Sequence, residues 1–372
     1  MRIDPRLDRF LDDSGLGNLV PEDAKEKAGR NSNFVVRTTT GRELFVKRIR
    51  MGGSDSLERF RACSAFDTLR RDDPEVRDSL PTALLVAHDE ELGFLAYEAV
   101  DGATSVAELV SEDEDSVVET HLAAIGSAMA ALHRLDVSRV PVREHEPAFP
   151  PVGWLDVLPW PVYHHASAPA LKIWHRLQSD DGVRTALVAL RDDERRAHPH
   201  AIHGDARLDQ FLIDGDGRLL LVDLEEFRRG DAARDIGALV GEWLHRATLD
   251  LLGDRATDTA ASLADSDLTH ADVIASGVAA LERRRPAISR FWASYREAGG
   301  GNDDPDFVDR VTRFAGWHLF DRMVAAAESA SRISALHWGA AGIGRQALLH
   351  PRAAAPALGL PGEPTNHQED AA

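Results

Sequence analysis

Hydrophobic and polar positions follow two different patterns along this 372-residue chain. In residues 34–49 and 80–100 the apolar side chains fit pairs of half-buried strands, and each pair is joined by a short polar turn. Residues 54–71, between the two pairs, carry apolar side chains at helical spacing. The pattern up to about residue 100 therefore predicts a β-rich unit with one prominent helix.

The pattern after residue 100 is mainly helical. Helices are expected at 117–136, at 168–195 and through most of 232–350. Residues 141–163 are expected to form a loop, because proline and aromatic residues crowd them. Two short β-like runs interrupt the helices at 201–227. This predicts a largely helical second unit that contains a small hairpin.

The change of pattern near Val100–Gly102 predicts the boundary between two lobes. We expect residues 1–100 to form an N-terminal nucleotide-binding lobe and residues 101–361 a C-terminal lobe with the catalytic and acceptor-binding residues. Residues 362–372 are polar throughout and are expected to form a disordered tail.

Composition narrows the class of protein. The net charge of −19 argues against a nucleic-acid partner, because phosphate backbones need a basic surface. It is compatible with a cationic substrate, and equally with the plain role of keeping the protein soluble. No apolar run approaches the ~20 residues of a membrane helix, and the charged N-terminus lacks a signal-peptide centre, so a cytoplasmic protein without a membrane partner is expected. The single cysteine, Cys63, excludes an internal disulfide and a Cys-rich zinc site.

The strongest chemical signal is the stretch 203–225. A hairpin there brings Asp205, Gln210 and Asp223 to one end, and each acid adjoins an apolar run where an unpaired charge is costly. Magnesium prefers hard oxygen ligands, and phosphoryl transfer needs a separate carboxylate for the attacking hydroxyl. The spacing therefore assigns Asp205 to the hydroxyl, and Gln210 and Asp223 to the metal.

These motifs resemble those of the aminoglycoside phosphotransferase and choline kinase-like family. The matching stretches are His203-Gly204-Asp205 with Gln210, and Val222-Asp223-Leu224-Glu225. Protein kinases carry H-R-D-L-x-x-x-N and D-F-G in the same two places. The resemblance implies an α+β, two-lobed protein-kinase-like fold, with a small β-rich N-terminal lobe and a larger, mainly helical C-terminal lobe. It also implies an ATP-dependent phosphotransferase that uses Mg²⁺.

The resemblance also implies roles for single residues. Asp205 is expected to be the catalytic base, Asp223 the principal Mg²⁺ ligand, and Glu225 an additional metal or water ligand. The family usually has asparagine where Gln210 stands. Glutamine keeps the carbonyl oxygen but reaches one methylene further, so the site has either an altered metal geometry or a weakened activity. Further along the chain, Asp235 is expected to brace the catalytic loop.

Lys47 is the expected phosphate ligand. The chain has four lysines, and Lys47 lies in the middle of a predicted strand among apolar neighbours. The alternative is an outward-facing lysine on an edge strand. The other ATP-binding residues that the resemblance implies are Asn31 and Ser32 in a phosphate-covering loop at 29–33, Glu58 as the acid partner of Lys47, and backbone groups of Glu98 and Val100 for adenine.

The sequence does not identify the acceptor of the phosphate. It is a hydroxyl of an amino sugar, an amino alcohol or a sugar, or of a peptide serine or threonine. Acids such as Glu242 and Asp250 are candidates for holding a cationic acceptor, and an aromatic lid is a further candidate, formed by Trp154, Trp160 and Tyr163.

Two other classes of protein are alternatives to the kinase interpretation. One is a zinc hydrolase that uses the closely spaced His198, His200 and His203. The other is a catalytically weak or inactive kinase-like module that binds a nucleotide or a partner. The sequence does not predict the oligomeric state.

Overall fold

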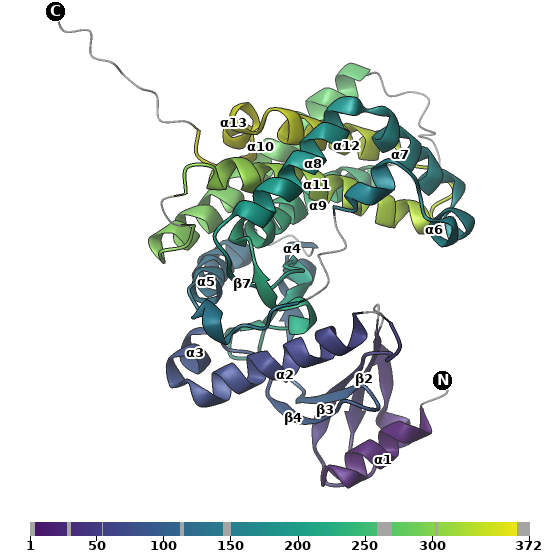
Figure 1. Ribbon diagram of the computed structural model, residues 1–372, viewed down its shortest axis with the longest axis vertical. Coiled ribbons are helices and arrows are strands. Elements are labelled where there is room, and N and C mark those ends of the chain that lie inside the picture. The colour runs from purple at the N-terminus through teal and green to yellow at the C-terminus, as the bar shows by residue number, and fades with distance from the viewer. Residues whose placement is uncertain are drawn as a thin grey trace, which may run out of the picture.

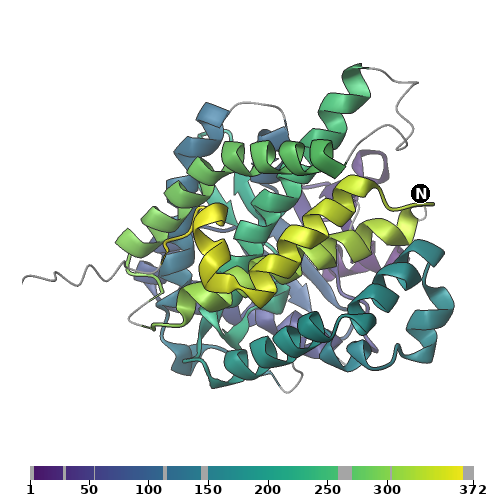
Figure 2. The same ribbon diagram turned by 90° about the horizontal axis from the view of Figure 1, so that it is seen from above.

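The computed structural model describes residues 4–27, 31–53, 55–111, 115–143, 150–258, 270–301 and 304–362. A small part with a β-sheet lies at one end of the molecule and a larger helical part at the other (Figure 1). Seen from above, the helices of the larger part lie over the sheet of the smaller one (Figure 2). This confirms the predicted α+β arrangement of a β-rich N-terminal region and a mainly helical remainder.

The N-terminal sheet has five antiparallel strands in the order β1-β2-β3-β5-β4. They are β1 (Lys25–Lys27), β2 (Ser32–Arg37), β3 (Glu43–Arg48), β4 (Leu85–Asp89) and β5 (Phe94–Glu98). Helix α1 (Pro5–Asp13) covers one face, where its Leu7 and Phe10 pack with Leu44 and Val46 of β3. Because side chains alternate along a strand, Lys47 points to the opposite face of β3.

Helix α2 (Ser56–Asp72) matches the predicted helix at 54–71 and is followed by α3 (Pro74–Ser79). Phe60 and Cys63 of α2 pack with Leu85 and Leu95 of the sheet. The helix therefore lies against the sheet face that carries Lys47.

Two small sheets follow the N-terminal one. The chain leaves β5 at Glu98 and enters β6 (Thr104–Ser105), which pairs with β8 (Phe211–Ile213) and through it with β9 (Leu219–Leu221). The strands β7 (His200–Ile202) and β10 (Arg228–Gly230) form a second pair. The β8–β9 pair confirms the predicted hairpin.

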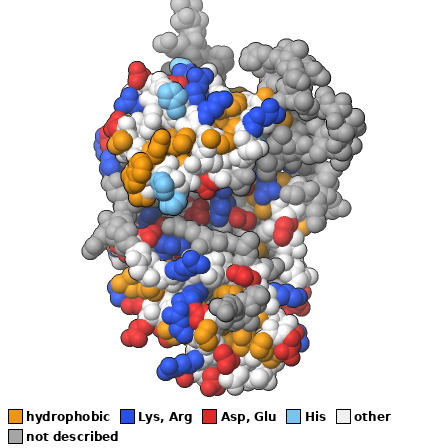
Figure 3. Space-filling view, turned by 90° about the vertical axis from the view of Figure 1, so that its right-hand side faces the viewer, with side chains coloured by type: hydrophobic (Ala, Val, Ile, Leu, Met, Phe, Trp, Pro, Cys, Tyr) orange, Lys and Arg blue, Asp and Glu red, His pale blue; other side chains and the backbone are white. Residues whose placement is uncertain are grey.

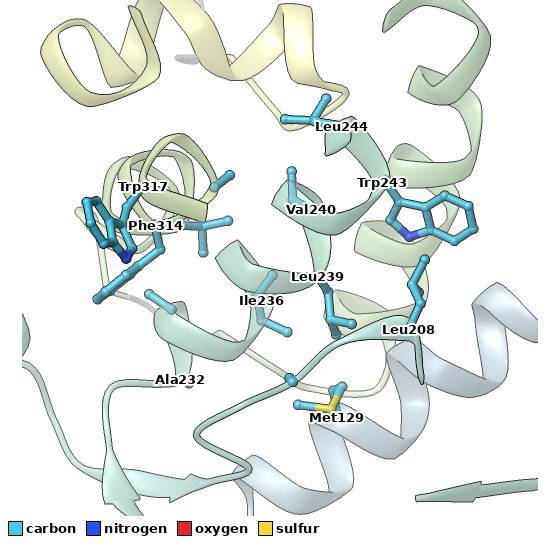
Figure 4. Close-up of a cluster of buried hydrophobic side chains, with 14 of the residues drawn as sticks. Met129, Leu208, Ala232, Ile236, Leu239, Val240, Trp243, Leu244, Phe314 and Trp317 are labelled. Atoms are coloured by element: carbon cyan, nitrogen blue, oxygen red, sulfur yellow. The ribbon is translucent and has the colours of Figure 1, made fainter. Parts of the chain in front are cut away.

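Helices build the rest of the described chain. They are α4 (Val106–Ser111), α5 (Asp115–His133), α6 (Trp160–His165), α7 (Ala168–Ser179), α8 (Asp181–Arg196), α9 (Ala232–Asp258), α10 (His270–Glu297), α11 (Phe307–Ser329), α12 (Ala335–Leu349) and α13 (Pro351–Ala354). The core gathers around α9, whose Ile236, Leu239 and Trp243 belong to the same buried cluster as Phe314 of α11. Phe314 lies on one side of α9 and Trp243 on the other (Figure 4). Gly237 permits this close packing, since a Cβ there would lie 2.6 Å from the Val311 carbonyl oxygen.

Two sequence predictions about the helical part were wrong. The single helix expected at 168–195 is broken at Asp180, whose carboxylate accepts a hydrogen bond of 3.1 Å from the Val183 N–H and so begins α8. The loop expected at 141–163 contains α6, which carries Pro161 in its first turn. In the described part of the chain, no helix is both long and apolar enough to cross a membrane.

Candidate active site

A cleft of about 1140 Å³ separates the N-terminal sheet from the helical part. Acidic and basic side chains gather in this hollow (Figure 3). Most of the residues predicted from sequence line it: Lys47, Asp205, Gln210, Asp223, Glu225, Asn31, Glu98 and Val100. Segments far apart in the sequence therefore meet at one place.

The β8–β9 hairpin sets Gln210 beside Asp223. The Val222 N–H donates to the Gln210 carbonyl oxygen at 2.9 Å, so the residue before β8 and the end of β9 lie side by side. Asp223 has φ 64°, and it is the one non-glycine residue in the described ranges with a positive φ. This left-handed conformation is costly for most side chains and is concentrated at functional sites. It turns the chain sharply as Asp223 enters the cleft.

The loop with Asp205 is anchored from α9. The Asp235 carboxylate accepts hydrogen bonds from the backbone N–H groups of His203 at 2.6 Å and Gly204 at 2.9 Å, and it contacts His133 Nε2 at 3.2 Å. The predicted brace is thereby confirmed. His203 is itself fixed, because its Nε2 lies 2.9 Å from the Val222 carbonyl oxygen.

Gly204 is required by the turn that precedes Asp205. It has φ 82°, and a Cβ there would lie 2.5 Å from the Glu226 carbonyl oxygen. Leu208, a few residues later, anchors the other side of the loop in the core near Trp243 (Figure 4). The loop is thus held at both ends and presents Asp205 to the cleft.

The Asp205 carboxylate lies in surroundings that oppose its charge. Its side chain is 49% exposed to the cleft, and Arg207 Nε lies 3.5 Å away. The protein on the other sides restricts water, and this burial outweighs Arg207 and raises the pKa of Asp205 to about 6. A carboxylate with a raised pKa binds a proton more readily, which suits a general base.

Lys47 is buried and doubly paired. Its ammonium group forms ion pairs with Asp223 Oδ1 and Glu225 Oε2, and its side chain is only 6% exposed. Burial alone lowers a lysine pKa, but here the two carboxylates outweigh it and raise the pKa of Lys47. The alternative of an outward-facing edge lysine is wrong.

Arg59 on α2 is buried beside the cleft without lining it, and no sequence pattern pointed to it. It pairs with Glu225 Oε1 and lies 3.6 Å from Glu226. The ion pairs of Lys47 go to Asp223 and Glu225, and not to Glu58, which does not line the cleft among the described residues. The predicted partner is displaced because Glu58 is one helical step, about 100°, away from the face that carries Arg59 and Cys63. The i, i+4 spacing of Arg59 and Cys63 is the signal that identifies this face.

The stretch from Glu98 to Val100 lines the cleft, and its contact with adenine stays a prediction. The Glu98 N–H donates to Leu84 and the Ala99 N–H to Glu43, whereas the Val100 N–H has no partner in the described ranges. Asn31 lies in the cleft, but Ser32 is half-buried in β2 and does not line it. The other predicted loop residues, Gly29 and Arg30, lie outside the described residues.

The far end of the cleft is formed by α11, which supplies Trp317, His318, Asp321 and Arg322. No motif in the sequence marks these four residues. The Asp321 and Arg322 side chains form an ion pair of 2.6 Å. This end of the cleft is therefore polar, with one aromatic wall.

The residues named from sequence for the acceptor lie elsewhere. Glu242 is buried and contacts His318 Nε2 at 2.9 Å, so this carboxylate is already paired. Trp154 packs on Trp174, and Trp160 and Tyr163 stack on each other at an exposed site, and none of them lines the cleft in the described structure. The side chain of Asp250 lies outside the described residues.

The donor set of the cleft fits a hard divalent cation. Gln210 and Asp223 offer amide and carboxylate oxygens, the kind that Mg²⁺ prefers together with phosphate oxygens. The Gln210 Nε2 donates to Asp209 Oδ1 at 3.3 Å, which orients the amide. The histidines offer no comparable zinc site. Across the described residues no group of three His, Cys, Asp or Glu side chains is arranged to hold a metal, so the zinc hydrolase has no support in the geometry.

A family model described as a phosphotransferase enzyme family matches residues 26–288, which is more than half of the chain. The chain therefore belongs to the phosphotransferase enzyme family. A comparison with curated proteins finds no match.

Solved structures with kinase-like folds resemble the chain over most of its length. An amicoumacin kinase in complex with AMP-PNP, Ca²⁺ and Ami is 13% identical over 93% of each chain, with a TM-score of 0.52. The gentamicin complex of APH(2")-IIa is 10% identical over 97% of this chain and 99% of that one, with a TM-score of 0.50. The choline kinase LicA from Streptococcus pneumoniae is 17% identical over 86% of this chain and 99% of that one, with a TM-score of 0.44. At these identities the likeness to the amicoumacin kinase and to APH(2")-IIa concerns the fold alone.

Proposed function

We propose that this phosphotransferase moves the γ-phosphoryl group of ATP to a hydroxyl of a small molecule, such as an amino sugar, an amino alcohol or a sugar, or of a peptide serine or threonine. The observation that carries the proposal is that Lys47, Asp205, Gln210 and Asp223 line one cleft between the two lobes. The AMP-PNP and Ca²⁺ in the similar amicoumacin kinase support a nucleotide and a divalent cation as its ligands.

Each cleft residue has a role that its position supports. Lys47 is set to hold phosphate oxygens, and Gln210 and Asp223 would hold Mg²⁺. The Val100 N–H and the Glu98 carbonyl would bind adenine. ATP, when bound, supplies the phosphoryl group. Asp205 orients the acceptor hydroxyl and takes its proton onto a carboxylate oxygen.

The acceptor is proposed to bind between Asp205 and α11. Trp317 offers an apolar face, and the neighbouring Asp321 and Arg322 offer both signs of charge. An acceptor with several hydroxyl groups and a charged substituent fits such a surface.

The assignment of Asp205 is tested by Asp205→Asn. We expect the variant to lose phosphate transfer by about 10²–10⁴-fold, because the base is gone while the shape is kept. ATP binding should persist, since Lys47, Gln210 and Asp223 remain. Asp216→Asn, in the exposed hairpin turn, is the matched control and should keep full activity. Full activity in Asp205→Asn contradicts the mechanism.

The assignment of Asp223 is tested by Asp223→Ala, read as nucleotide affinity against Mg²⁺ concentration. Removing a carboxylate ligand should weaken the magnesium-dependent part of binding, while binding in EDTA changes less. An unchanged magnesium dependence refutes the assignment.

The alternative is an inactive kinase-like module, which is suggested by Gln210 in place of the usual asparagine. Nucleotide binding by the natural chain without turnover on any acceptor supports this alternative.

A further inference from the structure

The carboxylate of Glu225 is fully engaged by the N-terminal lobe. Its Oε2 receives Lys47 Nζ and the Asn31 side-chain amide, the latter at 2.6 Å, and its Oε1 receives Arg59. These three donors come from the residue before β2, from β3 and from α2. One side chain that is only 8% exposed therefore ties three segments of one lobe to the other.

Asp223, two residues earlier, is in a different situation. Its Oδ1 pairs with Lys47, its side chain is 34% exposed, and its second oxygen has no partner in the described ranges. A metal ion needs a lone pair that is free to face it. Asp223 has one to offer, whereas both oxygens of Glu225 are already bound to cations or to an amide.

The charge of Glu225 is secured by its neighbours. Its carboxylate lies between the Lys47 ammonium group and the Arg59 guanidinium group, and its side chain is 8% exposed. A buried pair of this kind is strongly destabilised when one partner is removed, because the other charge is left unpaired.

We propose that Glu225 positions Lys47 for the phosphates, and that Arg59 holds Glu225 in place, so that the acid serving the lysine comes from the C-terminal lobe and not from α2. The inference rests on the proposed function and gives Glu225 the role of a positioning residue in place of a metal ligand. Helix α2 contributes a cation where the family resemblance expects an acid. The position of α2 is thereby coupled to that of the lysine.

The test compares Glu225→Gln, Arg59→Gln and the double variant with the natural chain. Measurements are kcat and KM for ATP at several Mg²⁺ concentrations, and the affinity for a fluorescent ATP analogue in EDTA. A misplaced lysine should lower kcat/KM by roughly tenfold to a hundredfold in both single variants. The Mg²⁺ concentration for half-maximal activity should stay the same. The two effects should not add in the double variant, because both act through one contact.

The affinity for the ATP analogue in EDTA separates this inference from the proposed function, since nucleotide binding in EDTA needs neither metal nor acceptor. Both single variants should bind the analogue about tenfold to a hundredfold more weakly, the loss that one charge-assisted hydrogen bond to the lysine carries. Arg59→Lys should recover part of the loss. Arg61→Gln, also on α2 and paired with Glu90 at the surface, is the matched control and should behave like the natural chain.

Two outcomes overturn the proposal. One is a higher Mg²⁺ concentration for half-maximal activity in Glu225→Gln and an unchanged one in Arg59→Gln. This result makes Glu225 a metal ligand. The other is a lowered melting temperature in both variants with unchanged kcat/KM and unchanged affinity in EDTA, which makes the cluster purely structural.

Discussion

At the scale of single residues, two carboxylates of the cleft have pKa values moved in opposite directions. Burial raises the pKa of Asp205 to about 6, whereas Lys47 and Arg59 outweigh burial at Glu225 and lower its pKa to about 2. When the pKa values of two titratable groups in one site are shifted in opposite directions, one group exchanges a proton and the other keeps its charge. Asp205 has the first character and Glu225 the second.

The raised pKa of Asp205 predicts the pH profile of the reaction. The base works only when it is ionised, so kcat/KM should fall about tenfold for each pH unit below about 6 and level off above it. A pH–rate profile with saturating Mg²⁺ measures this. A profile that stays flat down to pH 4.5 contradicts the role of Asp205, because an ordinary exposed aspartate titrates near 3.9.

The same shift gives a stability control for Asp205→Asn. A raised folded-state pKa contributes stability that is full below the unfolded value of 3.8 and is lost as the pH rises through about 6. Asparagine carries no charge at any pH. The variant should therefore melt no lower than the natural chain at pH 7.5, which separates loss of the base from loss of the fold.

The sequence predicts neighbours within one hairpin better than it predicts partners from distant segments. Asp205, Gln210 and Asp223 line one cleft, as their spacing within the hairpin predicted, and this spacing is a local feature. The contact of Glu225 with Arg59 joins residues 166 positions apart and depends on which face of α2 turns inward. The sequence pattern predicted an acid on α2 as the partner of Lys47, and Glu58 is the only glutamate there. It therefore did not predict the basic Arg59, which contacts Glu225.

At the scale of elements, the first turn of α9 holds the loop that carries Asp205. Asp235 is fully buried and satisfies two backbone N–H groups of that loop. Strong periodicity predicted α2, α5 and the β8–β9 hairpin well. The break between α7 and α8 was not predicted, because the helical pattern continues on both sides of it. The cap that begins α8 involves only the four residues from Asp180 to Val183.

This brace can be tested with Asp235→Asn. One oxygen becomes an amide that cannot accept a hydrogen bond, so a buried N–H group is left without a partner at a cost of about 1–3 kcal/mol. We expect a lower free energy of unfolding in a urea titration, together with a lower kcat as the Asp205 loop loosens. Asp216→Asn, in the hairpin turn with a side chain that is 73% exposed, should change stability by less than about 0.5 kcal/mol. Equal stability of Asp235→Asn and the natural chain contradicts the brace.

At the scale of the whole molecule, the two lobes meet over one charged cleft. The chain crosses once, between β5 and β6, and Lys47, Arg59 and Asn31 reach Asp223 and Glu225 from the other side. The sequence predicted this division from the change of periodicity near residue 100. It could not predict the end of the cleft formed by α11, since Trp317 and Asp321 lie in a helix whose pattern is that of an ordinary core helix.

The central claim is phosphoryl transfer from ATP to a hydroxyl. Its most direct test is an ATP-consumption screen of the purified chain with Mg²⁺ over amino sugars, amino alcohols, sugars and Ser/Thr peptides, with Asp205→Asn run in parallel. We expect at least one class of acceptor to raise ATP consumption above the acceptor-free rate, to gain a phosphate by mass spectrometry, and to show no such gain with the variant. Phosphorylated product at equal rates from both proteins, or tight ATP binding without transfer to any acceptor, contradicts the account.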